Sequence, residues 1–128
     1  MKPLNDKIYT AGYRNFSFYE FRDLVVQSNF FIVDVRYRPW SRIPFWTKDH
    51  LSISFTKYAH IPEFGNRYYN SKDKIEVVDL VTGFEKIDYF MGNEPILLLC
   101  ACEDYEACHR KIVAEYISEK TGLSIVNI

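Results

Sequence analysis

The sequence predicts a single α/β domain over residues 1–128, with a mainly parallel sheet of about five strands and helices on both faces. Two continuous apolar runs, at 30–35 and 95–100, are typical of strands that a parallel sheet buries on both faces. Strand-like and helix-like segments alternate along the chain, which favours βαβ units with right-handed crossovers. A length of 128 residues is that of one domain.

The predicted elements follow one another in that alternation. In order they are a strand at 7–11, a helix after Ser17, a strand at 30–35, a long loop at 36–52, a strand at 55–60, a loop at 62–70, a helix at 75–91, a strand at 95–100, a helix at 107–120 and a strand at 123–127. The helices have apolar residues at helical spacing, and the strands are short apolar runs bounded by turn residues. Pro39 and Pro44 break the pattern in the long loop, for which we predict about one helical turn. Gly83 is the weakest point of its helix.

Composition excludes several classes of function. The formal net charge is -1, so no overall field attracts nucleic acid or an anionic membrane, and an anion site must come from local arginines. No stretch approaches the roughly 20 apolar residues of a membrane span, and the N-terminus lacks the apolar core of a signal peptide. We therefore expect a cytoplasmic protein without a membrane partner.

The three cysteines, Cys100, Cys102 and Cys108, lie close together in the sequence. Their odd number and crowding differ from the spaced pairs of a disulfide-stapled secreted domain, which favours reduced thiols or a metal. With His109 they supply ligand types that Zn²⁺ takes. The spacing matches no known finger and no second ligand pair follows, so we assign no metal and no cofactor.

Polar residues follow four of the predicted strands. In parallel α/β sheets, ligands bind at the carboxyl ends of the strands, so these residues are expected at one functional edge. The candidate catalytic residues are Asp34, His60, Cys100 and His109, and the candidate ligand-binding residues are Arg14, Arg36, Arg38, Cys108 and Arg110.

Four stretches together resemble the domain-of-unknown-function 488 family. They are I-Y-T-A-G-Y-R-N at 8–15, D-V-R at 34–36 with Arg38-Pro39 following, residues 58–62, and L-L-L-C-A-C-E-D-Y-E-A-C-H-R at 97–110. The last stretch is the most specific, since strand, cysteine, acidic loop and C-H-R occur in the family's order. The resemblance implies a compact α/β fold with these residues at one edge, and it carries no settled reaction. Tyr13, where the family often has His, and the additional thiol of Cys102 depart from the common pattern.

Residues 108–110 are predicted in the first turn of a helix. There the unpaired backbone N–H groups and the macrodipole favour anions and lower the pKa of a thiol. Arg110 would add a planar donor fork suited to phosphate or carboxylate. In the alternative interpretation, Cys108 packs in the core and Arg110 pairs with the acidic residues of 103–106.

Cys100 ends an apolar strand, which leaves it two roles. With His109 and Arg110 nearby it would be a thiolate nucleophile, and without them a buried packing residue. Its eight-residue separation from Cys108 does not fit the compact C-x5-R loop of cysteine phosphatases.

Asp34 and Arg36 lie two residues apart at a strand end, so they share a face of the sheet. Their ion pair would either orient Arg36 toward a ligand or only satisfy both charges. His60 would serve as a general base, with Glu63 or Asn66 as an orienting group, or have a structural role.

The first functional hypothesis is a protein that binds a phosphate-bearing ligand, a nucleotide or nucleic acid, and acts on it. Arg36 and Arg110 would hold the anion, and His60 or Cys100 would supply the reactive group.

Two other hypotheses compete with it. A non-catalytic nucleic-acid-binding module would use residues 36–48, where basic and aromatic side chains alternate. A rhodanese-like sulfur carrier is suggested by F-I-V-D-V-R at 31–36, by H-I-P at 60–62, and by the cysteine that ends a later strand ahead of a helix. The acidic segment 103–106 speaks against the carrier, because it would repel a bound persulfide.

Overall fold

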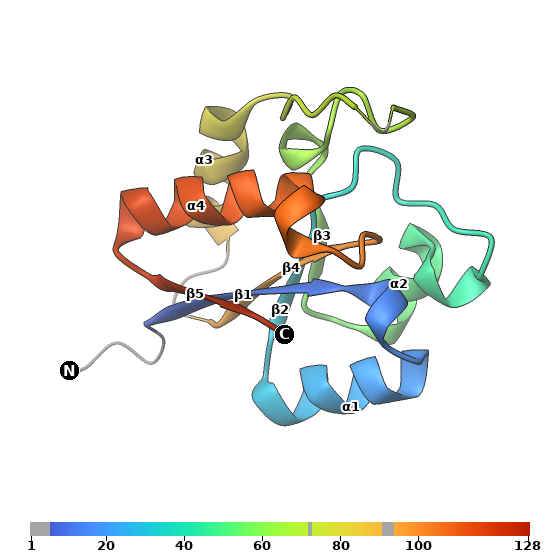
Figure 1. The fold of residues 1–128 in the computed structure, drawn as a ribbon. Helices are drawn as coiled ribbons and strands as arrows, with labels where there is room; N and C mark the ends of the chain where they lie inside the picture. Colours follow the sequence, from blue (N-terminus) through green and yellow to red (C-terminus); the bar gives the residue numbers. More distant parts are fainter. Residues whose placement is uncertain (1–5, 72, 91–93) are drawn as a thin grey trace.

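A computed structural model describes residues 6–71, 73–90 and 94–128, and it contains a five-stranded parallel sheet with helices on both faces (Figure 1). The strands are β1 (Lys7–Gly12), β2 (Phe31–Asp34), β3 (Tyr58–His60), β4 (Ile96–Cys100) and β5 (Ser124–Asn127). Their order in the sheet is β3-β2-β4-β1-β5, and every neighbouring pair is parallel. β4 is central, with all five residues buried, as its apolar run predicted. The predicted α/β fold class is confirmed.

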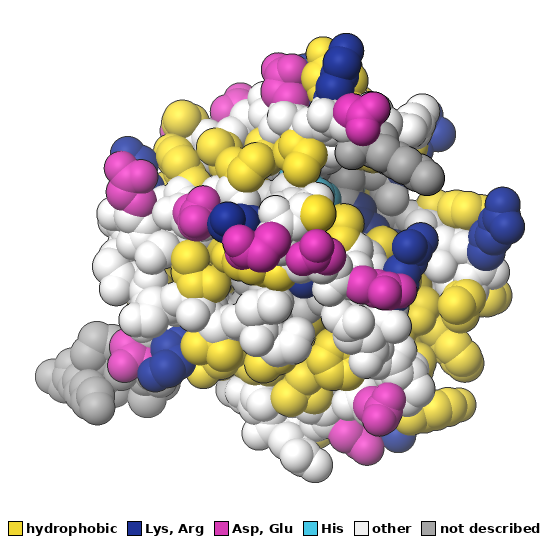
Figure 2. Space-filling view, in the orientation of Figure 1, with side chains coloured by type: hydrophobic (Ala, Val, Ile, Leu, Met, Phe, Trp, Pro, Cys, Tyr) yellow, Lys and Arg dark blue, Asp and Glu magenta, His cyan; other side chains and the backbone are white. Residues whose placement is uncertain are grey.

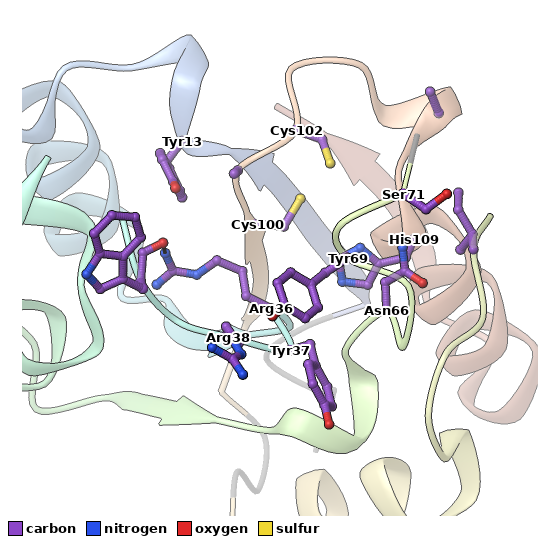
Figure 3. Close-up of a pocket in the computed structure, with 14 residues that line it drawn as sticks. Tyr13, Arg36, Tyr37, Arg38, Asn66, Tyr69, Ser71, Cys100, Cys102 and His109 are labelled. Carbon is purple, nitrogen blue, oxygen red and sulfur yellow. Dashed lines mark hydrogen bonds between the residues drawn. The ribbon is translucent and has the colours of Figure 1, made fainter. Parts of the chain in front are cut away.

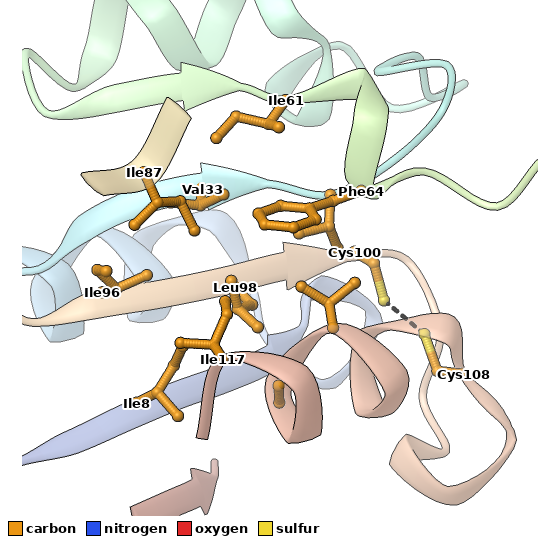
Figure 4. Close-up of a cluster of buried hydrophobic side chains, with 13 residues drawn as sticks. Ile8, Val33, Ile61, Phe64, Ile87, Ile96, Leu98, Cys100, Cys108 and Ile117 are labelled. Carbon is orange, nitrogen blue, oxygen red and sulfur yellow. Dashed lines mark hydrogen bonds between the residues drawn. The ribbon is translucent and has the colours of Figure 1, made fainter. Parts of the chain in front are cut away.

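The helices divide the core into two layers. They are α1 (Phe18–Ser28), α2 (Lys48–Ser54), α3 (Leu80–Phe90) and α4 (His109–Thr121). Leu97 and Leu99 of β4 pack with residues of α1 and α2 on one face. Leu98 and Cys100 pack with residues of α3 and α4 on the other face (Figures 1 and 4). This alternation places the Cys100 side chain on the face that α4 covers.

Local capping signals explain where α1 and α4 begin and end. Ser17 and Glu20 form a capping box, in which each side chain accepts a hydrogen bond from the other residue's backbone N–H. This confirms the helix predicted after Ser17. Gly122 ends α4 with φ of 79°, a left-handed conformation that favours glycine.

The prediction of a long loop at 36–52 is wrong for the second half of this range, which is largely helical. A short 3₁₀ turn occupies Pro44–Trp46, and α2 begins at Lys48. Thr47 caps this helix, since its side chain accepts a hydrogen bond from the backbone of His50 at 3.3 Å. Both prolines precede α2, so they do not prevent a helix from forming there. The strand predicted at 55–60 is also too long, because β3 begins at Tyr58.

The helix predicted at 75–91 begins later than its apolar spacing indicated. α3 starts at Leu80, after Asp79, whose carboxylate accepts hydrogen bonds from the backbone and hydroxyl of Thr82. Residues 73–79 before it are not helical, and Val77 forms an isolated antiparallel bridge with Asn66. The final residue of the predicted range, residue 91, lies outside the described residues.

Within the described part of the chain, no helix is both long enough and apolar enough to cross a bilayer.

Candidate functional site

The carboxyl ends of the parallel strands bring most of the candidate residues to one edge. Asp34, His60 and Cys100 are the last residues of β2, β3 and β4. Cys108 is the N-cap of α4, so the helix begins at His109, two residues later than predicted. Arg14 is exposed in the 3₁₀ turn after β1 and lines a separate hollow.

A pocket of about 400 Å³ opens at this edge (Figure 3). Its polar and sulfur-bearing lining includes Arg36, Arg38, Cys100, Cys102 and His109. Four aromatic side chains line the same pocket, namely Tyr13, Tyr37, Trp40 and Tyr69. In Figure 3 the sulfur atoms of Cys100 and Cys102 point toward each other. The pocket therefore combines guanidinium groups, aromatic rings and thiols.

The basic and aromatic segment 36–48 is only partly anchored to the core. Trp46 is buried and stacks on Tyr13, with 4.7 Å between ring centroids. Trp40 is 66% exposed beside the pocket. One tryptophan thus holds the segment in place, and the other is free to contact a ligand.

Asp34 and Arg36 form a buried two-point ion pair. Arg36 donates from Nε and from a terminal nitrogen to the two carboxylate oxygens at 2.8 and 2.7 Å. Tyr58 donates its hydroxyl to the same carboxylate at 2.6 Å. Burial lowers the pKa of Arg36, but the hydrogen bonds and charge of Asp34 outweigh that effect and raise it overall. Arg36 is thus charged and held in a fixed orientation at the pocket wall.

Two histidines are fixed by backbone carbonyl oxygens. His60 Nε2 lies 2.7 Å from the carbonyl oxygen of Arg36, and His109 Nε2 lies 2.6 Å from that of Val35. In both histidines burial is the main cause of a lowered pKa, which favours the neutral ring. Only His109 lines the pocket.

Neither residue predicted to orient His60 is engaged with it in the structure. Glu63 pairs with Lys86 at 2.6 Å. The Asn66 side chain bonds to the backbone of Tyr68 and Glu76. Among the described residues, His60 therefore has a backbone partner and no carboxylate to orient it as a general base.

The three cysteines form one cluster. Their Sγ atoms all lie within 4.8 Å of one another, and those of Cys100 and Cys108 are 2.9 Å apart (Figure 4). No disulfide joins them. Cys100 and Cys108 are buried, whereas Cys102 is partly exposed and lines the pocket. Cys102 is therefore the thiol that a pocket ligand reaches most directly.

The pKa values of Cys100 and Cys102 are shifted in opposite directions within the cluster. Burial raises the pKa of Cys100 well above its ordinary value. Hydrogen bonds from Cys100 and Cys108 lower the pKa of Cys102, and the positive charge of Arg110 lowers it further, which together outweigh the opposing effect of burial. A thiolate in this cluster thus resides on Cys102.

Arg110 lies beneath the cluster rather than at the surface. Its side chain is fully buried and donates to Cys100 Sγ at 3.1 Å and to the Cys102 carbonyl oxygen at 3.0 Å. The alternative in which Arg110 pairs with the acidic segment is wrong, because Lys111 makes the ion pair with Glu106. Among the described residues, Arg110 has no carboxylate within salt-bridge distance.

Gly12 permits this arrangement. A Cβ atom at its position would lie 1.7 Å from the Cys102 carbonyl oxygen and 3.3 Å from the terminal nitrogen of Arg110. The end of β1 therefore lies directly against the loop between β4 and α4, and only a residue without a side chain fits there.

Acidic side chains of this loop face solvent. Glu103, Asp104 and Glu106 are exposed. Figure 2 shows a band of acidic side chains across the middle of the viewed face, over α4 and the segment between β4 and α4 in Figure 1, and no broad basic patch beside it. The negative charge thus lies outside the pocket, while Arg36 and Arg38 line its wall.

Sequence reasoning did not select Cys102 or the pocket tyrosines as site residues. Cys102 carried a signal, because it lies two residues after Cys100, but its membership of a three-sulfur cluster depends on the loop that returns Cys108. Tyr37 and Tyr69 stack at 5.6 Å from segments far apart in the chain, and no local pattern predicts that contact.

Comparison of the chain with protein-family models, curated proteins and solved structures found no match. Membership of the domain-of-unknown-function 488 family stays a prediction from the motifs.

Proposed function

We propose that the pocket binds a phosphate-bearing ligand with an aromatic base, either a nucleotide or single-stranded nucleic acid. The observation that carries this proposal is the lining of one pocket by two arginines and four aromatic side chains. Guanidinium groups suit phosphate oxygens, and aromatic rings suit the faces of bases.

Arg38 is the arginine best suited to meet a phosphate. Two of the Arg36 nitrogens are engaged by Asp34. Arg38 is exposed and lies over the ring of Tyr69, with 5.5 Å between its central carbon and the ring centroid. Among the described residues it has no carboxylate partner. Its donors are therefore available to an anion, and Arg36 supplies a fixed positive charge behind it.

Any reaction on this ligand would depend on Cys100, Cys102 and His109, because these are the reactive side chains that line the pocket. His60 and Arg110 lie outside its lining. An enzymatic role would therefore use Cys102 as the accessible nucleophile, rather than His60 as a general base.

Isothermal titration with a panel of mononucleotides and short oligonucleotides tests the proposal. Arg38→Gln removes a charged hydrogen-bond donor, so we expect about a tenfold or greater loss of affinity. Arg22→Gln is the matched control, since Arg22 is an exposed arginine on α1 and lies outside the pocket lining. Equal affinities in the two variants, or no binding by any member of the panel, would contradict the proposal.

The same titrations separate the two sources of the ligand. A non-catalytic nucleic-acid-binding module would bind oligonucleotides alone, with affinity that falls steeply as salt rises and survives Cys100→Ser. A nucleotide pocket would bind mononucleotides with a shallower dependence on salt.

A rhodanese-like sulfur carrier is the third candidate, after the nucleic-acid-binding module, and the partly exposed thiol of Cys102 in the pocket favours it. The Cys102 thiolate would attack the outer sulfur of thiosulfate, break its S–S bond and release sulfite, leaving a persulfide on the protein. Mass spectrometry after thiosulfate treatment should find one added sulfur atom in wild type and none in Cys102→Ser. An unchanged mass in wild type would reject the carrier.

We propose the cytosol as the site of action. The cytosol keeps thiols reduced, and all three cysteines here are free thiols in mutual contact range.

A further inference from the structure

The three sulfur atoms are spaced as ligands of one metal ion. A tetrahedral zinc ion with Zn–S bonds of about 2.3 Å holds its sulfur ligands about 3.8 Å apart. In this protein the Sγ atoms of Cys100 and Cys108 are 2.9 Å apart, and all three sulfurs lie within 4.8 Å of one another. Side-chain movements of less than about 1 Å would give the metal geometry.

The charge beneath the cluster supports the same assignment. Arg110 is fully buried, cannot lose its proton and has no carboxylate partner among the described residues. A buried charge of this kind needs an anionic partner, and the sulfur that receives its hydrogen bond belongs to the cluster. Three thiolates around a divalent cation carry one net negative charge, which balances the guanidinium. A monovalent cation would leave an excess negative charge in the core.

His109 is oriented as histidines beside metals are. Its Nε2 faces the Val35 carbonyl oxygen at 2.6 Å, and because a carbonyl only accepts, this nitrogen carries the proton. The lone pair is then on Nδ1, which lies 3.8 Å from Cys108 Sγ. A hydrogen bond from the remote ring nitrogen to a carbonyl is the usual arrangement that fixes a ligating or neighbouring imidazole.

We propose that Cys100, Cys102 and Cys108 bind a divalent cation of the zinc class, with three sulfur ligands and a fourth position that faces the pocket. The thiol protons displaced by the metal pass to solvent. Cys100, Cys102 and His109 line the pocket, which supplies both the path to the site and the space for a fourth ligand. This inference goes beyond the phosphate-ligand proposal and does not depend on it.

The direct test titrates reduced, metal-free protein with Zn²⁺ in competition with a chromophoric chelator, and in parallel with Co²⁺. We expect one ion per chain and a thiolate-to-cobalt charge-transfer band. Cys102→Ser should weaken Zn²⁺ binding by at least about 100-fold, since even second-shell changes cost 10–100-fold. His50→Gln, which removes a metal-binding side chain on α2, should leave the affinity unchanged. Equal affinity in wild type and Cys102→Ser, or a cobalt spectrum without the thiolate band, would overturn the site.

A second measurement on the unaltered chain remains decisive if a variant does not fold. Reduced wild-type protein is treated with N-ethylmaleimide with and without Zn²⁺, and the labelled cysteines are identified by mass spectrometry. We expect Zn²⁺ to slow labelling of Cys102 most, because it is the partly exposed member of the cluster. Labelling that Zn²⁺ leaves unchanged would reject the proposal. Nucleotide titrations with and without Zn²⁺ measure the affinity for the phosphate-bearing ligand in both states. Failure of the metal proposal can therefore be told apart from failure of the phosphate-ligand proposal.

Discussion

Asp34 is a fully buried carboxylate whose two oxygens are both hydrogen bonded. An unpartnered carboxylate in this position would be costly, so its donors from Arg36 and Tyr58 are part of the fold as well as of the site. The two interpretations of the Asp34–Arg36 pair in the sequence are therefore compatible. The pair satisfies both charges, and it also fixes the guanidinium at the pocket wall.

Tyr58→Phe tests how much the Tyr58 hydroxyl contributes to this network. The substitution removes the 2.6 Å hydrogen bond to Asp34 and leaves the buried carboxylate with Arg36 as its donor. Because hydrogen bonds to charged groups contribute about 1.5–3 kcal/mol, we expect the free energy of unfolding in urea to fall by that amount. Tyr19→Phe, at an exposed tyrosine, should change it by less than about 0.5 kcal/mol. Equal effects of the two substitutions would show that the Asp34 network contributes nothing measurable.

His60 should make the stability of the protein depend on pH. Burial lowers its pKa in the folded state, so the unfolded chain binds more protons as the pH falls below about 6.5. Stability should therefore be complete above that pH and decrease toward the lower, folded pKa. His60→Gln keeps a donor for the Arg36 carbonyl but does not titrate, so urea midpoints measured from pH 7.5 to 5 should decline less steeply than in wild type. An equally steep decline would assign the dependence to other groups, such as His109, whose pKa burial also lowers.

At the scale of elements, the junction of β1 with the loop between β4 and α4 is the most restrictive contact near the site. Gly12→Ala would place a methyl group on the Cys102 carbonyl oxygen and force the loop to move. Overpacking of this kind costs about 1–3 kcal/mol, and the shift should also change the maleimide reactivity of Cys102.

Gly122→Ala is the control for that substitution. Its Cβ would meet nothing within 4 Å, but φ of 79° strains an alanine by about 1–2 kcal/mol. Urea denaturation should thus find both variants destabilised, whereas cysteine labelling should change only in Gly12→Ala. Unchanged labelling in Gly12→Ala would mean that the loop does not depend on the close approach.

The helices and strands differ in how well the sequence predicts them. β4 was predicted almost to the residue, because burial on both faces requires a continuous apolar run. α2 was missed, because its seven residues contain one buried side chain, Leu51, and its signal is the Thr47 cap rather than an apolar stripe. The burial of Arg110 was not predictable either. An arginine after an acidic loop is usually solvated, and only the approach of Gly12, Cys100 and the loop carbonyl makes it an interior residue.

At the scale of the whole molecule, the sheet joins the two layers of the core. One layer, with Trp46, lies between the sheet and α1 and α2. The other, with Cys100 and Cys108, lies between the sheet and α3 and α4 (Figure 4). The central strand β4 contributes alternate residues to both layers, so neither layer can lose its packing without disturbing the other.

We therefore expect the protein to unfold in one cooperative transition. In the Trp40→Phe variant, Trp46 is the single tryptophan and reports the α1–α2 layer by fluorescence. The reactivity of the buried Cys100 and Cys108 thiols, measured by short labelling pulses in rising urea, reports the α4 layer. Coincident midpoints are expected, since a single domain of this size usually unfolds in two states. Earlier exposure of the thiols would instead indicate that α4 and the cysteine cluster open as a separate unit, which would make the site accessible without global unfolding.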